Sequence, residues 1–337
     1  MTKPESRELT LTEAVGVFEA MPAEWHLASL HPAMVEVDAK RDLSLRPVHW
    51  CFRDGERCLL HSFHLGENRG FVMKDIQSAY GYGGPLSNTD DAPFLAAADL
   101  ALKQWARDHA VVAEFLRFHP LVPHARWYAG DVAHNRDTVH IDLAGDLFER
   151  YPTRRRTDIR RFLEGGVRVE KVPPAVMQGS FPGLYRENMD RIGAASSYYF
   201  PEGYFDALFR FGGAENWLAY AGDRAIAGAV VLVSARARIA EYHLGAKTDG
   251  SDRQRATIGL LHVAASFYQS MQFRYFYLGG GRSVATDDSL LFFKKGFSPL
   301  TGRFQTGSRV YDAGRYAELK GMFPDKAATG RVLFYKT

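Results

Sequence analysis

The residues most able to do chemistry lie in the segment Asp287–Phe297, where two lysines follow an apolar run. Acids at its start, lysines at its end and a stop at Gly296 predict a short helix. Phenylalanines flank Lys294 in sequence, so we expect its stem to be partly buried. A lysine in apolar surroundings can stabilise a negative charge that develops during a reaction. The alternative is an ordinary helix-end charge that faces water.

Two glycine-rich turns could let the backbone approach a ligand closely. Tyr275–Arg282 is an apolar strand that runs into three glycines and a cation, which suits the carboxyl edge of a sheet. Tyr80–Leu86 sets two tyrosines, with flat faces and hydroxyl groups, among glycines. For each turn the alternative is a plain Gly-rich loop.

The standard motifs of nucleophilic, metal and nucleotide sites are absent from the sequence. It holds no GxSxG, no HExxH, no GxxxxGK[ST] and no GxGxxG that opens a helix after a strand. The 12 histidines show no metal-ligand spacing. Cys51 and Cys58 flank a predicted turn, and we expect them to be small buried apolar residues. We therefore expect no metal and no resident cofactor.

The elements that must position these turns occur twice along the chain. In each half a hairpin leads, through further extended segments, to a helix and then a strand. The predicted pairs are Pro47–Phe63 and Trp217–Ser234, Phe94–His109 and Thr257–Met271, and Val111–Phe118 and Arg274–Leu278. The tryptophan, glycine and arginine of the first hairpin recur at one offset of 167 positions (217 − 50, 222 − 55 and 224 − 57). Repetition of this kind favours a duplicated fold.

Length and composition fit two soluble α/β domains with mixed sheets. The chain has 337 residues, 46% hydrophobic and 24% charged, and a net charge of +3 that permits an anionic partner. We expect a first domain over 1–148 and a second over 149–337, with a terminal strand near 331–336 that packs back on the first. The N-terminus lacks an apolar signal core, and the longest apolar run, Ala225–Val233, is too short to span a membrane. We expect a cytoplasmic monomer.

Taken together, these segments resemble the FemABX family, whose best-known members attach amino acids from aminoacyl-tRNA to peptidoglycan precursors. The most specific likeness runs from Leu278–Arg282 to Phe293–Phe297. Weaker patches are Tyr80–Leu86, Glu114–Leu121 and Arg155–Val169. The family fold is two GNAT-like (acyl-CoA N-acyltransferase-like) domains, which agrees with the repeat. The long helical arm of the staphylococcal members has no counterpart here.

The resemblance implies roles for individual residues. Lys294 would stabilise the charge that forms when an amine attacks an ester, with Lys295 as the second choice, and no protein nucleophile would be needed. The phosphate-bearing acceptor would lie against tyrosines and basic groups. The candidates for substrate binding are Tyr80, Tyr82, Arg117, Tyr242, Arg282 and Lys295.

The donor is the point that the sequence leaves open. Ordinary GNAT enzymes bind acyl-CoA through a Gly-rich turn that opens a helix. The segment Asp252–Gly259 is basic and opens a helix, but Ala256 stands where the first glycine should be. Arg253 and Arg255 could hold phosphate of CoA or of the terminal adenosine of tRNA. We favour tRNA.

A basic run over 154–161, which includes Arg155 and Arg160, fits an RNA donor. Phosphate contacts by arginine give salt-dependent RNA binding. The alternative, of equal weight, is a solvated helix face.

Three hypotheses follow. The first is an aminoacyltransferase that forms an amide on a peptide-like or cell-wall-precursor-like acceptor from aminoacyl-tRNA. The second is an acyl-CoA-dependent N-acyltransferase of exopolysaccharide or natural-product biosynthesis, and the third is a non-catalytic binding protein of the same fold. In the first two we expect a single cleft shared by the two halves.

Overall fold

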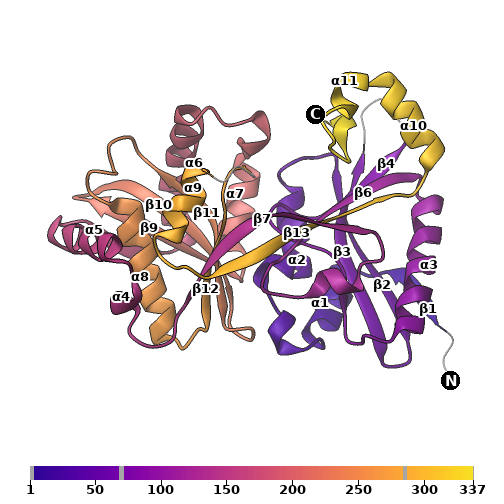
Figure 1. The fold of residues 1–337 in the computed structure, drawn as a ribbon, viewed down its shortest axis with the longest axis horizontal. Coiled ribbons are helices and arrows are strands. Elements are labelled where there is room, and N and C mark those ends of the chain that lie inside the picture. Colours follow the sequence, from indigo (N-terminus) through magenta and orange to yellow (C-terminus); the bar gives the residue numbers. More distant parts are fainter. Residues whose placement is uncertain (1–3, 68–71, 284–286, 337) are drawn as a thin grey trace. The chain divides into compact units, whose positions relative to one another are not determined.

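The computed structural model describes residues 4–67, 72–283 and 287–336, and the chain forms two compact units (Figure 1). Unit 1 holds Met1–Asn135 and Phe304–Thr337, and unit 2 holds Arg136–Arg303. Each unit is a mixed sheet with helices on both faces, which confirms the predicted α/β class. The repeated order of hairpin, strand, helix and strand is also confirmed.

The sheet of unit 1 begins with antiparallel strands, which are followed by a parallel pair and then by one more antiparallel strand. In spatial order its strands are β1 (Glu5–Glu8), β2 (Leu45–Asp54), β3 (Arg57–Glu67), β4 (Lys74–Gln77), β6 (Val111–Phe118) and β13 (Thr301–Val310), and the short β5 (Leu86–Ser87) pairs with β3. Strand β6 runs parallel to β4, and β13 runs antiparallel to β6. The turn between β2 and β3 places Gly55 at a φ of 61°, as the Asp-Gly pair predicted.

Helices cover both faces of this sheet. Alternate side chains of β2 and β3, such as Trp50 and Phe63, pack under α3 (Ala92–Asp108). The opposite face contacts α1 (Leu11–Glu19) and α2 (Pro32–Ala39). The chain ends with α10 (Ala313–Met322), α11 (Pro324–Ala327) and the 3₁₀ helix η5 (Phe334–Lys336).

The predicted terminal strand near 331–336 is therefore wrong, because η5 forms there instead. Its apolar residues do pack on the first unit as expected. Phe334 is buried with Val112 and Ala113 of β6 and with Leu319 of α10. Lys336 adds an ion pair of 3.0 Å to the buried carboxylate of Asp75 on β4. The segment therefore makes the expected core contact, but as a 3₁₀ helix and not as a strand.

Unit 2 repeats this plan. In spatial order its strands are β8 (Arg168–Val172), β9 (Ala214–Ala221), β10 (Arg224–Ser234), β11 (Ile239–Lys247), β12 (Tyr275–Gly280) and β7 (Asp131–Asp142). Its helices are α4 (Leu147–Arg150), α5 (Thr153–Glu164), α6 (Pro174–Arg191), α7 (Glu202–Arg210), α8 (Ala256–Ser270) and α9 (Ser289–Lys295). Strand β12 runs parallel to β11 and antiparallel to β7. Short 3₁₀ helices elsewhere are η1 (Ala23–Trp25), η2 (Ala28–Leu30), η3 (His124–Trp127) and η4 (Ser196–Tyr198).

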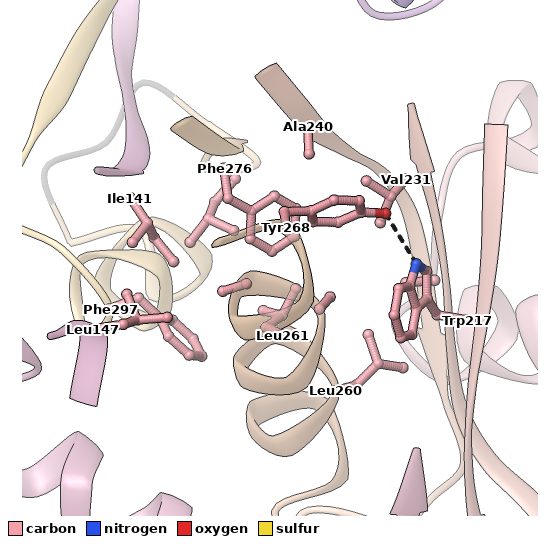
Figure 2. Packing of buried hydrophobic residues seen from close by; sticks show 14 of the residues in the cluster. Ile141, Leu147, Trp217, Val231, Ala240, Leu260, Leu261, Tyr268, Phe276 and Phe297 are labelled. Carbon is pink, nitrogen blue, oxygen red and sulfur yellow. Dashed lines mark hydrogen bonds between the residues drawn. The ribbon is translucent and has the colours of Figure 1, made fainter. Parts of the chain in front are cut away.

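The main core of unit 2 lies between the sheet and α8. Figure 2 shows Leu260, Leu261 and Tyr268 of α8 facing the strands, and Trp217 Nε1 donating a hydrogen bond of 3.1 Å to the Tyr268 hydroxyl. Helix α5 packs on α8 on this side, while α6 and α7 contact the strands from the other face. Burial of this apolar cluster holds the strands that carry the candidate site against α8.

The division between the units differs from the expected boundary at 148/149. Strand β7 begins in unit 1, and its residues Thr138–Asp142 pair with β12 in unit 2. Strand β13 begins in unit 2, and its residues Gln305–Val310 pair with β6 in unit 1. A single boundary at 148/149 would therefore assign these paired residues of both β7 and β13 to the wrong unit.

Within the described ranges, no helix combines the length and the apolar character needed to cross a membrane.

The contact between α5 and α8 requires a glycine. A Cβ at Gly259 would collide with the Phe162 ring, whereas one at Gly179 of α6 would meet no described residue within 4 Å. We predict that Gly259→Ala lowers the free energy of unfolding by about 1–3 kcal/mol through overpacking. The matched control Gly179→Ala should be neutral or raise it by about 0.5–1 kcal/mol. Urea unfolding measures both, and equal effects would contradict the α5–α8 packing.

Candidate active site

The site in unit 2 begins where two parallel strands separate. Strands β11 and β12 pair only over Ile239–Glu241 and Tyr275–Tyr277. Beyond these pairs β11 continues along β10 and β12 continues along β7. We call the divergence after Glu241 and Tyr277 the fork. Along the fork, the backbones of β11 and β12 form no β-ladder with each other.

Lys294 reaches into this fork from α9. Its Nζ donates a hydrogen bond of 2.7 Å to the Gly280 carbonyl on β12 and lies 5.9 Å from the ring centroid of Tyr242 on β11. A Cβ at Gly279 would lie 3.3 Å from Nζ, and Gly279 has a φ of 79° that favours glycine. The side chain is only 7% exposed, so the ammonium group sits between the two strands rather than in water.

Burial changes the ionisation of this pair. Desolvation lowers the pKa of Lys294 to about 7, and the Asp288 carboxylate opposes that change. Burial also raises the pKa of Tyr242 to about 12, so its hydroxyl group keeps its proton near neutral pH. A cation at this position is poorly solvated and would gain from a neighbouring negative charge.

Asp288 connects the residues that directly follow β12 to the start of α9. Its carboxylate accepts hydrogen bonds from the N–H groups of Arg282 (2.8 Å), Ser283 (2.9 Å) and Leu291 (2.9 Å). Burial opposes ionisation here, but these hydrogen bonds hold the pKa of Asp288 at about 2. The Gly-rich junction and the start of α9 are therefore tied together through one ionised side chain. The side chain of Arg282 is exposed at this loop.

The aromatic residues near Lys294 in sequence lie elsewhere in space. Phe292 is 69% exposed. Phe293 and Phe297 pack against the guanidinium of Arg155, whose Cζ lies 5.0 and 4.1 Å from their ring centroids. The surroundings of Lys294 are instead the fork strands and Asp288. Lys295, the second choice for its role, is exposed.

Arg155 corrects one expectation for RNA binding. It is 7% exposed, and its guanidinium donates to the carbonyls of Phe293 (2.9 Å) and Gly296 (3.2 Å). A side chain occupied in this way cannot present its charge to phosphate, because position 155 of α5 faces α9 and not solvent. Arg160, five residues further along α5, is exposed.

The start of α8 has features that suit an anion. The N–H groups of Thr257 and Ile258 have no backbone acceptor among the described residues, as expected for a first helical turn. Arg253 is exposed beside them. Arg255 is less available than predicted, because it donates to Asp158 at 2.7 Å and to the carbonyls of the preceding turn.

The matching helix in unit 1 lacks these features. Asp91 caps α3, and its carboxylate accepts from the Phe94 N–H at 3.1 Å. An acid at the helix start repels a phosphate, so the two halves differ at this position.

In unit 1 the parallel strands β4 and β6 also separate, after Gln77 and Phe115, and we call this divergence the fork of unit 1. The chain itself occupies it. After β4 the backbone folds onto β6, where Ser78 N–H donates to Phe115 O at 3.2 Å and Gly83 N–H donates to Arg117 O at 2.8 Å. The predicted turn Tyr80–Leu86 is thereby placed beside Arg117. The buried Asp38 carboxylate accepts from the Tyr80 N–H at 2.8 Å and holds the turn from the α2 side.

Beside this turn is a small pocket of unit 1 that the sequence did not reveal. It is lined by Tyr82, Gly83, Gly84 and Ser62, among other residues. The Ser62 hydroxyl lies 3.0 Å from His49 Nδ1, and His49 Nε2 lies 3.2 Å from Glu36. These polar residues come from three separate elements with no common spacing, so only the fold brings them together.

The predicted site residues thus form two groups, each described within its own unit. Unit 2 gathers Lys294, Tyr242 and the loop of Arg282, and unit 1 gathers Tyr80, Tyr82 and Arg117. The shared cleft stays a prediction.

Two GNAT-like units in tandem form the fold class, and the chain has the fold of FemX (TM-score 0.66, 13% identity, 95% of this chain and 99% of that one). Similar structures include a C-terminal domain assigned to a lysylphosphatidylglycerol synthetase from Agrobacterium fabrum (TM-score 0.61, 14% identity, 94% and 97%). Another is a tandem GNAT protein from the clavulanic acid biosynthesis pathway (TM-score 0.55, 12% identity, 93% and 100%).

At the level of sequence, no protein-family model and no curated protein matches the chain.

The buried ammonium group should destabilise the fold. The pKa of Lys294 is lowered to about 7, so at neutral pH the unfolded chain binds more protons than the native protein. Stability should therefore rise with pH above about 7, until Lys294 is neutral in both states. We predict that Lys294→Met raises the free energy of unfolding at pH 7 by about 1–3 kcal/mol.

Urea titration at pH 7 and pH 9 measures this effect, with Lys295→Met as the control on the exposed neighbour. The gain from Lys294→Met should shrink at the higher pH. A loss of stability at pH 7 would contradict the described environment of Lys294.

Proposed function

We propose that the protein is an aminoacyltransferase that moves an amino acid from aminoacyl-tRNA to an amine of a peptide-like or cell-wall-precursor-like acceptor. The observation that carries the proposal is the ammonium of Lys294, which is buried in the fork at 2.7 Å from the Gly280 carbonyl. In its protonated form such a group can lie beside a reacting carbonyl without attacking it, because an ammonium has no free electron pair. The FemX fold supports the proposal.

The chemistry needs no covalent intermediate on the protein. The acceptor amine attacks the ester carbonyl, and the carbonyl oxygen becomes negatively charged. The Lys294 ammonium turns from the Gly280 carbonyl to that oxygen and stabilises it. As the intermediate collapses, the amide forms, the ester C–O bond breaks, and a proton of the amine leaves with the terminal ribose hydroxyl. Removing one oxyanion donor typically slows acyl transfer about 10²–10³-fold.

Other features support a phosphate-bearing donor on unit 2. The first-turn N–H groups of α8 and the exposed Arg253 offer one phosphate contact, and the exposed Arg160 offers another on α5. Tyr80, Tyr82 and Arg117 on unit 1 are the proposed acceptor wall.

The second candidate is acyl-CoA-dependent N-acyl transfer. The start of α8 favours it as well, because the pyrophosphate of CoA would suit the same N–H groups. A tandem GNAT protein among the similar structures is consistent with this donor. The missing glycine at Ala256 and the altered role of Arg255 make the CoA site incomplete.

Donor competition distinguishes the two. We predict that charged tRNA and a panel of amines give an amide product, that ribonuclease added beforehand abolishes it, and that Lys294→Ala lowers its rate about 10²–10³-fold. Product that survives ribonuclease and appears only with acyl-CoA would replace the first proposal with the second. Unchanged turnover by Lys294→Ala would remove this residue from the mechanism.

The pH dependence gives a separate test. Only the protonated form of Lys294 stabilises an oxyanion, and burial lowers the pKa of Lys294 to about 7. With an acceptor whose amine is already neutral, such as hydroxylamine, single-turnover rates should fall as pH rises through about 7. This limb should vanish in Lys294→Met. A wild-type rate that stays flat from pH 6 to about 9 would contradict the role.

A further inference from the structure

A lysine in the last turn of a helix has two ordinary fates: it extends into water, or it bonds the free carbonyl groups of its own helix end. Lys294 does neither. Its Nζ points away from the end of α9 to the Gly280 carbonyl in the fork. Another group must therefore bond the carbonyl groups at the end of α9 in place of Lys294 and hold the helix there.

Arg155 occupies the position that a capping lysine would take. From α5 its guanidinium donates to Phe293 O at 2.9 Å and to Gly296 O at 3.2 Å, the carbonyls that end α9. The same group stacks on the Phe297 ring at 4.1 Å. A Cβ at Gly296 would collide with the guanidinium, so the fit leaves no spare room.

Arg155 is also firmly placed itself. It is 7% exposed, and Asp158 one turn later lies 4.0 Å from its guanidinium. Helix α5 is anchored by the close contact of Phe162 with Gly259 of α8. The chain of contacts thus runs from α8 through α5 to the end of α9, which is opposite the end held by Asp288.

We propose that Arg155 is a positioning residue for Lys294: by capping the C-terminal carbonyls of α9, it keeps the ammonium of Lys294 in the fork. This inference rests on the proposed function for its catalytic consequence, but not for its structural content. Arg155 touches no substrate in this account. Its loss leaves the Gly296 carbonyl without this donor and the Phe293 carbonyl with only the Gly296 N–H. The end of α9 then frays, and Lys294 turns outward to cap it.

The direct test is the pH dependence of Lys294 acetylation by trace acetic anhydride, read by mass spectrometry. Lys295 lies in the same peptide and serves as the internal reference. In the wild-type protein the labelling midpoint of Lys294 should lie near its pKa of about 7. In Arg155→Met, which keeps bulk but no donors, the midpoint should rise by about one unit or more, and labelling should become faster.

Two further variants control for folding and charge. Arg155→Lys keeps a cation with fewer donors and should give an intermediate midpoint. Arg161→Met removes an exposed charge from the same helix and should leave the Lys294 midpoint in place. Circular dichroism confirms which variants are folded. If Arg155→Met is not folded, the Arg155→Lys midpoint decides the question.

Activity is the second readout. Once transfer is established, Arg155→Met should lower kcat about 10²-fold, because Lys294 is displaced. The KM for charged tRNA should change little, because RNA binding is unaffected. A folded Arg155→Met with a wild-type Lys294 midpoint overturns the proposal, whatever its activity. A wild-type protein that transfers nothing from tRNA would defeat the proposed function, while the labelling result would still judge Arg155.

Discussion

The hydrogen bond between the Lys294 ammonium and the Gly280 carbonyl is the interaction on which the rest of the site depends. A charged group only 7% exposed is unfavourable unless the surrounding structure holds it. Two ionised side chains do this from opposite ends of α9, Asp288 through backbone N–H groups and Arg155 through backbone carbonyls. A seven-residue helix has little stability of its own, so these contacts define where it lies.

The two units have the same fold but hold different groups at the same positions. Both sheets have a parallel pair that separates after a few residues. In unit 2 the fork holds a lysine, and in unit 1 it holds the chain's own turn at Tyr80–Leu86. The helix starts differ as well. The first N–H groups of α8 have no backbone acceptor in the part of the chain that the structure describes, whereas an acid caps α3. The two units thus share an element order and differ in the groups found at the same positions.

The sequence was informative where a feature is local. The hairpins were predictable because Asp-Gly and Gly-Asp turns set their geometry, and both tryptophans fall at core positions. The repeat offset then indicated the tandem fold. The unit boundaries were not predictable, because β7 and β13 join their sheets through partners far away in sequence.

The site residues were predictable in type more than in environment. Lys294 was identified, but its burial comes from the fork and not from the adjacent phenylalanines, since neighbours in a helix point in different directions. Arg155 lies within a run of arginines that reads as a uniform basic face. One member of such a run turns inward only when another helix is present to receive it, and α9 is more than a hundred residues away in sequence.

The central claim is that Lys294 holds the negative charge of an acyl-transfer intermediate in the fork. A crystal structure with a phosphonate analogue that joins an aminoacyl-adenosine mimic to an amine would test it most directly. We expect a phosphonyl oxygen about 3 Å from Lys294 Nζ. A phosphonate bound elsewhere, with Lys294 still bonded only to the Gly280 carbonyl, would contradict it.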